Sequence, residues 1–196
     1  RRPLKVAYWI LVYLMTLISL LFSQRAISVS EYARSESSSG YISLFRDRFT
    51  VIPHGVSDIF SPPKKNAKRE NFLLAVSDLY VQKNLKNLIC ALPLLKTDHP
   101  DITLKIAGNP VDQNYFVELK RTVAQENLDD TVEFLGEVSP ETLVELYRCC
   151  GVFVFPSTVE TFGNPLVEAM ACGAPIASSN TAAMPEVVSE AAVFFN

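Results

Sequence analysis

The fold is decided by the stretch Val154-Phe-Pro-Ser-Thr-Val-Glu-Thr-Phe-Gly-Asn-Pro-Leu-Val-Glu-Ala-Met170. An apolar run ends within it at Phe155, a small turn follows at Gly163, and helical spacing extends over residues 164–172. A buried strand, a turn and a helix in this order are typical of one unit of an α/β sheet.

Two glutamates lie on either side of this expected helix start. Glu160 precedes it, and Glu168 follows after seven intervening residues. Because the first N–H groups of a helix favour negative charge, a phosphate could bind the backbone of Phe162, Gly163 and Asn164. The two carboxylates could then accept hydrogen bonds from sugar hydroxyls. The spacing fits equally well a plainer interpretation, in which the two acids only complement the helix dipole.

The same alternation of strand and helix extends outward from this unit. It predicts a Rossmann-like, doubly wound parallel α/β sheet with flanking helices. The five expected strands cover residues 72–76, 102–107, 132–135, 152–155 and 175–177, and the chain ends on a further apolar, strand-like run. The expected helices cover residues 83–96, 115–126 and 164–172, with another beginning at 140. Ligands bind such sheets at the carboxyl ends of the strands, which here are Ser77, Gly108, Gly136, Ser157 and Ser178.

A change of composition divides the chain. Residues 53–71 carry three prolines, few large apolar residues and a basic run of Lys64, Lys65, Lys68 and Arg69. Such a run is typical of a solvated linker. We therefore expect one region over residues 1–50, a linker over 51–70 and a Rossmann-like domain over 71–196. Because the first residue is Arg1 and not Met, the sequence reads as part of a longer protein.

The N-terminal region opens with an apolar helix pattern. In residues 6–22, only Thr16 and Ser19 are neither apolar nor aromatic. Seventeen residues are at the lower limit for a membrane span. The helix could span a bilayer, lie at its surface through Tyr8, Trp9 and Tyr13, or be buried against a sheet or partner domain. The strand-like segment that follows favours the last two.

Composition excludes several classes of function. Hydrophobic residues make up 48% and charged residues 20%, as in globular proteins. The net charge of −3 gives no basic excess for nucleic acid. The four cysteines form no C-x-x-C pair and are typical of reduced thiols in a cytoplasmic protein. With two histidines and no Asp-x-Asp, the sequence predicts no metal site, and no other cofactor motif occurs.

Several longer strings carry a resemblance to a known family. VETFGNPLVEAMACGAPIASSNTAAMPEVV closely resembles the signature of glycosyltransferase family four, the retaining nucleotide-sugar transferases with the two-domain GT-B fold. The string LAVSDLYVQKNLKNLICAL resembles the first strand and the phosphate-binding lysine of the donor domain, and FLGEVSPETLVELY resembles a later part of it. VSEYARSE and VIPHGVSDIF resemble the segment that joins the two domains.

The resemblance implies a role for each matching position. Residues 71–196 are the donor-binding domain, and residues 1–50 are the end of the acceptor domain. By this resemblance, Glu160 and Lys83 would be the catalytic residues, with Glu160 contacting the donor sugar and Lys83 the diphosphate. The remaining donor contacts are Phe162, Gly163 and Asn164 to the sugar and diphosphate, Glu168 to the ribose, and Gly136, Glu137 and Val138 to the base.

The resemblance also implies a function. We expect transfer of a hexose, mannose in particular, from a GDP- or UDP-linked donor to a glycan or lipid-linked acceptor in polysaccharide or lipopolysaccharide biosynthesis, at the inner face of the membrane. We expect residues 1–196 alone not to turn over. The alternative is a non-catalytic module that binds nucleotide-sugars, because Asp78 and Gln82 stand where the family carries arginine.

Overall fold

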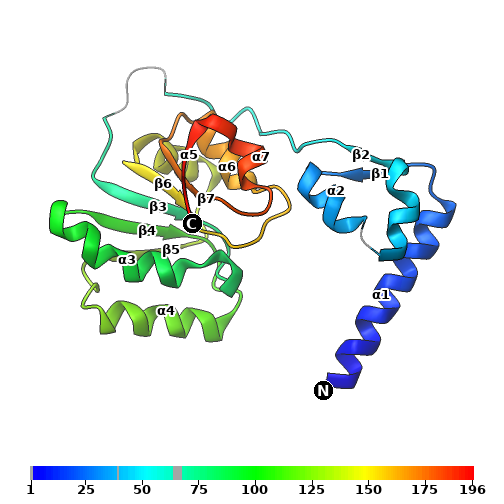
Figure 1. Cartoon of the computed structure of the whole chain (residues 1–196). Helices are drawn as coiled ribbons and strands as arrows, with labels where there is room; N and C mark the ends of the chain where they lie inside the picture. Colours follow the sequence, from blue (N-terminus) through cyan, green and yellow to red (C-terminus); the bar gives the residue numbers. More distant parts are fainter. Residues whose placement is uncertain (1, 39, 64–67) are drawn as a thin grey trace. The chain divides into compact units, whose positions relative to one another are not determined.

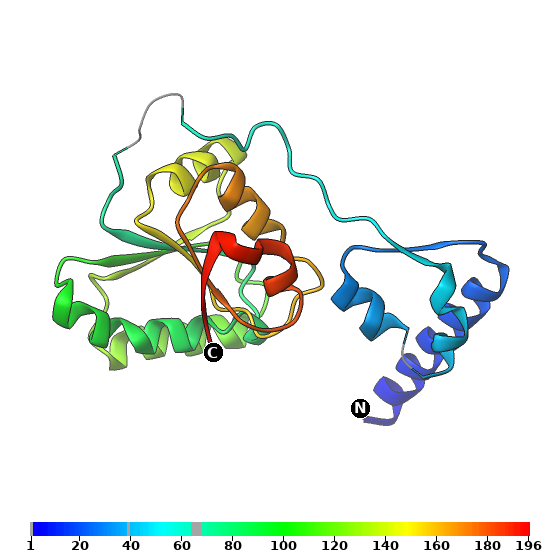
Figure 2. The same cartoon turned by 45° about the horizontal axis from the view of Figure 1, so that its top comes forward.

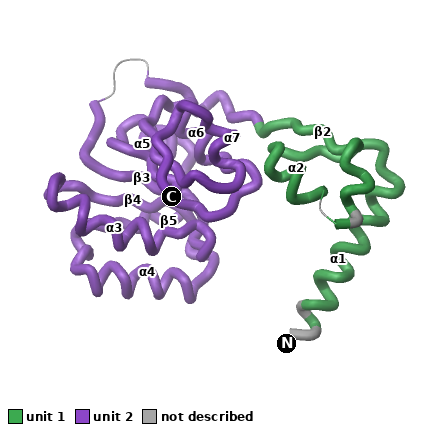
Figure 3. Tube along the Cα trace, viewed as in Figure 1, with its two compact units in different colours: residues 1–54 green, residues 55–196 purple. Residues whose placement is uncertain are grey.

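A computed structural model describes residues 2–38, 40–63 and 68–196 (Figure 1). The chain divides into two compact units, residues 1–54 and 55–196 (Figure 3). Lys64 and Lys65 of the expected basic linker lie outside the described residues.

The first unit begins with the expected apolar helix and the strand that follows it, and it adds a second helix, a 3₁₀ segment and a second strand. Helix α1 (Arg2–Phe22) leads to strand β1 (Ala26–Ser28), helix α2 (Glu31–Ser37), the 3₁₀ segment η1 (Gly40–Arg48) and strand β2 (Phe49–Val51). Strand β1 pairs in parallel with β2. Ser30 caps α2 by accepting a hydrogen bond from the N–H of Ala33 at 2.9 Å.

Helix α1 keeps much of its apolar surface exposed within this unit. Trp9 is 66% exposed and Phe22 is 86% exposed, whereas Leu20 is buried. The guanidinium of Arg48 donates to the carbonyls of Leu20 and Ser23 at 2.6 and 2.7 Å, and so satisfies the C-terminal end of the helix. Across the residues described, no helix combines the length and the apolar character that crossing a bilayer requires.

The second unit is built on a six-stranded parallel sheet in the order β5-β4-β3-β6-β7-β8. This confirms the expected Rossmann-like, doubly wound sheet. The strands are β3 (Phe72–Val76), β4 (Thr103–Ala107), β5 (Val132–Gly136), β6 (Val152–Phe155), β7 (Ile176–Ser179) and β8 (Ala192–Phe195).

Among the residues described in the second unit, five helices flank the sheet. Helices α3 (Leu85–Asp98) and α4 (Gln113–Gln125) cover one face, and α5 (Pro140–Cys149), α6 (Asn164–Ala171) and α7 (Met184–Val188) cover the other (Figure 1, Figure 2). The short 3₁₀ segments η2 (Val81–Lys83) and η3 (Ser189–Ala191) precede α3 and β8.

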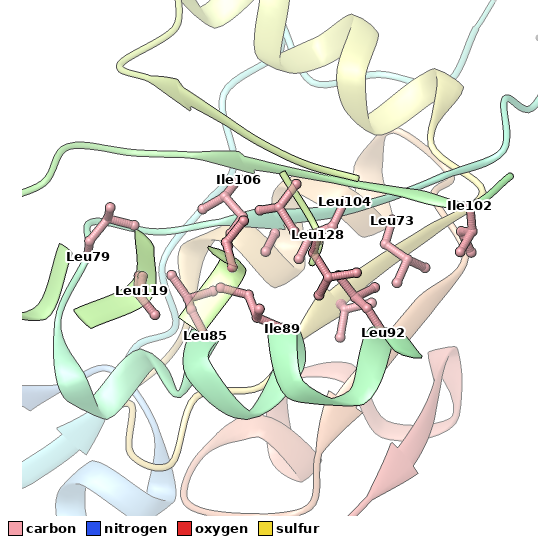
Figure 4. Packing of buried hydrophobic residues seen from close by; sticks show 14 of the residues in the cluster. Leu73, Leu79, Leu85, Ile89, Leu92, Ile102, Leu104, Ile106, Leu119 and Leu128 are labelled. Atoms are coloured by element: carbon pink, nitrogen blue, oxygen red, sulfur yellow. The ribbon is translucent and has the colours of Figure 1, made fainter. Parts of the chain in front are cut away.

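Alternation along β3 divides the core between the two faces. Leu73 and Ala75 belong to the cluster under α3 and α4 (Figure 4), whereas Phe72 and Leu74 belong to the cluster under α5, α6 and α7. Both faces of the strand are therefore buried. This explains why the strand reads as a continuous apolar run rather than as alternating apolar and polar residues.

Two expectations about the elements need correction. The count of five strands was too low, because the apolar run at the end of the chain pairs with β7 as a sixth strand. The helix expected from residue 83 begins at Leu85, because Asn84 adopts a left-handed conformation with φ 55° and separates η2 from α3.

The contacts of Arg69 contradict the expectation that the basic run only faces solvent. Its guanidinium donates to the carbonyls of Tyr147 and Cys150 at 3.3 and 3.2 Å, and to the carbonyl of Gly173 at 2.5 Å. These carbonyls lie at the ends of α5 and α6, where partial negative charge gathers. Arg69 therefore joins the C-terminal ends of two helices.

Candidate functional site

The strand order defines where a ligand can bind. After β3 the chain moves outward to β4 and β5, and it then returns to place β6 on the opposite side of β3. The carboxyl ends of β3 and β6 therefore form the topological switch point, at which doubly wound sheets open a crevice. Lys83 follows β3 and Glu160 follows β6.

Lys83 and Glu160 form an ion pair at this switch point. The Nζ atom of Lys83 lies 2.5 Å from Oε1 of Glu160, and the two side chains are 19% and 16% exposed. The main chain beside them is also joined, because Thr158 donates to the carbonyl of Gln82 through its N–H at 2.8 Å and its hydroxyl at 3.1 Å. The structure thus brings together the two residues expected to be catalytic.

Phe162, Gly163 and Asn164 lead into α6 as expected. Gly163 has φ 91°, and a Cβ there would lie 3.1 Å from a methyl group of Leu166. Glycine relieves both the strain and the contact. Phe162 is buried and Asn164 is exposed at the first position of the helix. The backbone here has the positive end of the helix dipole.

Glu168 lies within α6 and faces α5. Its Oε2 accepts a hydrogen bond from the hydroxyl of Tyr147 at 3.0 Å. Burial raises the pKa of this carboxyl above its usual value, and the hydrogen bond from Tyr147 opposes that shift. Tyr147 carried no signal in the sequence, because a tyrosine at an apolar helix position reads as core.

An open cavity of about 320 Å³ lies at the carboxyl ends of β3, β4 and β5. It contains two of the residues expected to contact a base, Glu137 and Val138, whereas Gly136 directly precedes them and does not line it. Gly136 has φ 66° and turns the chain away from β5. The lining residues are Val76, Ser77, Asp78, Ala107, Gly108, Asn109, Glu137, Val138 and Leu143.

Gly108 lies where the loops after β3 and β4 approach each other. Its φ is 143°, and a Cβ would lie only 1.9 Å from the carbonyl oxygen of Ser77. Beside it, the N–H of Asn109 donates to Oδ1 of Asp78 at 3.1 Å. The loops after β3 and β4 are therefore in direct contact, and only glycine fits between them.

The expected strand-end serines differ in their placement. Ser77 lines the cavity, but Ser157 and Ser178 are 1% and 0% exposed. The carbonyl of Ser157 accepts from the hydroxyl of Ser179 at 2.5 Å, so these serines tie β7 to the loop after β6. Among the residues described, no group of three or more His, Cys, Asp or Glu is arranged to hold a metal ion.

The strand order and the polar loops at its switch point define a class, the doubly wound parallel α/β domains in which loops gather at one sheet edge. Comparison with known proteins gives the family. The model of the glycosyl transferases group 1 family matches residues 57–195, and the chain belongs to that family. The family resemblance expected from the sequence is confirmed.

Two curated relatives are named for the transfer of different sugars. The chain is 30% identical over 190 residues to the O-antigen chain mannosyltransferase B of Escherichia coli, covering 88% of this chain and 48% of that protein. It is 32% identical over 143 residues to the phosphatidylinositol N-acetylglucosaminyltransferase gpi3 subunit of Schizosaccharomyces pombe, covering 72% of this chain and 31% of that protein. The chain spans less than half the length of these relatives.

Solved structures show the same fold. Anabaena Alr3699/HepE in complex with UDP and glucose superposes with a TM-score of 0.79 at 21% identity, covering 94% of this chain and 52% of that one. The C-terminal domain of a group 1 glycosyl transferase (LpcC) from Francisella tularensis superposes with a TM-score of 0.62 at 24% identity, covering 72% of this chain and 80% of that one. The expected GT-B half is therefore confirmed as a fold.

Proposed function

We propose that the protein transfers a hexose from a nucleotide-sugar donor to a glycan or lipid-linked acceptor, and that residues 71–196 bind the donor. The observation that carries this proposal is the Lys83–Glu160 ion pair at the switch point of the sheet. A cation and a carboxylate placed there match the two ends of a sugar diphosphate, the anionic leaving group and the polyhydroxyl ring.

In this proposal Lys83 leaves Glu160 when the donor binds. Its ammonium then pairs with the diphosphate and stabilises the negative charge that develops as the glycosidic bond breaks. The backbone of residues 162–164 adds the positive end of the α6 dipole on the same charge. Glu160, released from Lys83, accepts hydrogen bonds from sugar hydroxyls. Transfer with retention of configuration follows from the family resemblance.

The nucleoside would occupy the cavity beside this site. The loop of Gly136, Glu137 and Val138 would contact the base, and Glu168 would bind the ribose. Support comes from the cavity's position at the ends of β3, β4 and β5, and from the complexes of the HepE structures with UDP and UDP-glucose. Lys83 and the helix dipole supply positive charge, so we propose that donor binding needs no metal. Excess EDTA should then leave the affinity for UDP or GDP unchanged.

We further propose mannose as the sugar, polysaccharide or lipopolysaccharide biosynthesis as the setting, and the inner face of the membrane as the location. The mannosyltransferase names of several relatives support the sugar and the setting. Exposed apolar side chains on α1, Trp9 among them, support contact with a bilayer surface. Flotation with liposomes should be lost when residues 1–24 are removed; equal flotation would exclude this contact.

Calorimetric titration with UDP, GDP, UDP-glucose and GDP-mannose tests the donor site. We expect one nucleotide to bind saturably, and Lys83→Ala to weaken its binding by at least about tenfold, because a charged partner of the diphosphate is lost. The matched control is Lys86→Ala. Lys86 also pairs with a glutamate, Glu118 at 2.6 Å, but on the surface between α3 and α4. Equal effects of the two substitutions would contradict the assignment of Lys83.

A specific observation also favours a second function, a non-catalytic module that binds nucleotide-sugars. Asp78 lines the cavity and Gln82 adjoins Lys83, so an acid and a neutral residue stand where the family resemblance implies arginine. A diphosphate there would meet less positive charge. Sugar transfer that is abolished by Lys83→Ala would exclude this second function, whereas nucleotide binding without transfer by the full-length protein would favour it.

A further inference from the structure

The hydroxyl of Tyr147 reaches from α5 to the carboxylate of Glu168 on α6. The oxygen atoms are 3.0 Å apart, and Tyr147 is 0% exposed. Only Oε2 of Glu168 takes part. Within the described part of the chain, Oε1 accepts no hydrogen bond, so it is available to a donor group from outside.

The ring of Tyr147 is held from two sides. Phe153 on β6 meets it edge to face with the ring centroids 5.2 Å apart, and Phe60 does the same at 6.2 Å. Next along α5, Arg148 donates to the carbonyl of Ser61 at 2.9 Å, which fixes the segment that carries Phe60. The tyrosine hydroxyl therefore has one position and not a range of rotamers.

The protonation states suit this contact. Burial raises the pKa of Tyr147 well above its usual value, so the phenol keeps its proton and remains a hydrogen-bond donor. A donor at Oε2 stabilises the charged form of Glu168 against the cost of its burial. The hydrogen bond from Tyr147 thus favours the charged form, which accepts at both oxygens, although burial leaves the pKa of Glu168 raised overall.

We propose that Tyr147 is a positioning residue, which orients Glu168 so that Oε1 accepts a hydrogen bond from a ribose hydroxyl of the bound nucleotide. This inference rests on the proposed function and goes one step further, because it names what fixes the ribose-binding carboxylate. A glutamate side chain has three rotatable bonds, and a tether at one oxygen leaves the other in a single place before the ligand arrives.

The test measures preference for ribose over deoxyribose. The 196-residue chain is titrated with UDP and GDP, and the one that binds is compared with its 2′-deoxy and 3′-deoxy analogues. Ribose preference is the affinity for the nucleotide divided by the affinity for a deoxy analogue. Of the two ratios, one for each analogue, the larger is used. We expect about tenfold in the wild type, as one charge-assisted hydrogen bond provides, and about threefold or less in Tyr147→Phe. A purely structural role would weaken the nucleotide and its analogues equally and leave the ratio unchanged.

Two further variants make the outcomes distinct. Tyr115→Phe is the matched control, because it also removes a buried tyrosine hydroxyl that is hydrogen-bonded, here to the N–H of Lys86 at 3.2 Å, away from the cavity. It should retain the wild-type ratio. A ratio lowered by Glu168→Gln but not by Tyr147→Phe overturns the positioning role alone. A chain that binds neither nucleotide, or shows no ribose preference, overturns the proposed donor site and this inference together.

Discussion

Lys83 and Glu160 lie 77 positions apart in the chain, yet Nζ of one is 2.5 Å from Oε1 of the other. The contact joins the loops that follow two neighbouring strands, β3 and β6. In the structure, each of the two residues satisfies the charge of the other. In the proposed function, a donor exchanges this contact for two new ones, so its binding would not leave either charge without a partner.

The first prediction concerns the energy of that contact. In a double-mutant cycle with Lys83→Met and Glu160→Gln, we expect a coupling of ~1–2 kcal/mol in the free energy of unfolding, since both side chains are mostly buried. Urea unfolding measures it. Saturating nucleotide should reduce the coupling, because the diphosphate takes over Lys83. A coupling that nucleotide leaves unchanged would contradict the exchange.

Gly108→Ala is expected to cost ~4 kcal/mol or more, or to prevent folding. Its Cβ would lie 1.9 Å from the Ser77 carbonyl oxygen, at φ 143°. Gly136→Ala is the control, since its φ is 66° but no atom lies within 4 Å of the added Cβ. There we expect only the backbone strain, ~1–2 kcal/mol. Similar midpoints of urea unfolding for the two variants would show that the close approach of the two loops is wrong.

Arg69→Met should lower the free energy of unfolding by ~1–2 kcal/mol. The variant keeps an aliphatic chain but loses three hydrogen bonds to carbonyls at the ends of α5 and α6. Lys68→Met removes a neighbouring exposed charge and is the control, with an expected change within ~0.5 kcal/mol. If both substitutions have the same effect in thermal unfolding, the loss belongs to net charge and not to the helix ends.

The raised pKa of Glu168 predicts that the stability of the protein depends on pH. Burial raises the pKa of this carboxyl in the folded protein above its unfolded value. The folded state then binds more protons between the two values, so stability falls as pH rises through that window and stays lower above it. Glu168→Gln removes this penalty and keeps an acceptor for Tyr147. Its stability relative to the wild type should be greatest near pH ~7 and decline toward pH ~4. A difference independent of pH would refute the assignment.

The fold could be predicted from the sequence because it rests on periodicity. Strands buried on both faces, such as Phe72–Val76, read as continuous apolar runs, and α6 follows the glycine turn at Gly163. The sixth strand was harder to assign, because β8 is partly exposed at an edge of the sheet.

The candidate site could be predicted only in part. Lys83 and Glu160 carry a family motif, but the contacts of Tyr147 and Arg69 are made between segments far apart in the chain. Local spacing does not encode such contacts. A buried tyrosine has the same local sequence pattern whether or not its hydroxyl contacts a carboxylate. An arginine in a basic run likewise has the same pattern whether or not it bonds to helix ends. The left-handed conformation of Asn84 places Lys83 outside α3. The apolar periodicity of the sequence does not indicate this conformation.

The order of the strands also bears on how the protein acquires its site during folding. Strand β3 pairs with β6 at Leu73 and Val152, and the chain between these two strands contains both β4 and β5. Closing so long a loop is slow compared with local helix formation. The cavity walls after β3, β4 and β5 can form before β6 docks, whereas the Lys83–Glu160 pair cannot. That ion pair thus marks the docking of β6 against β3, and the nucleotide affinity proposed for this site would be regained only after that step.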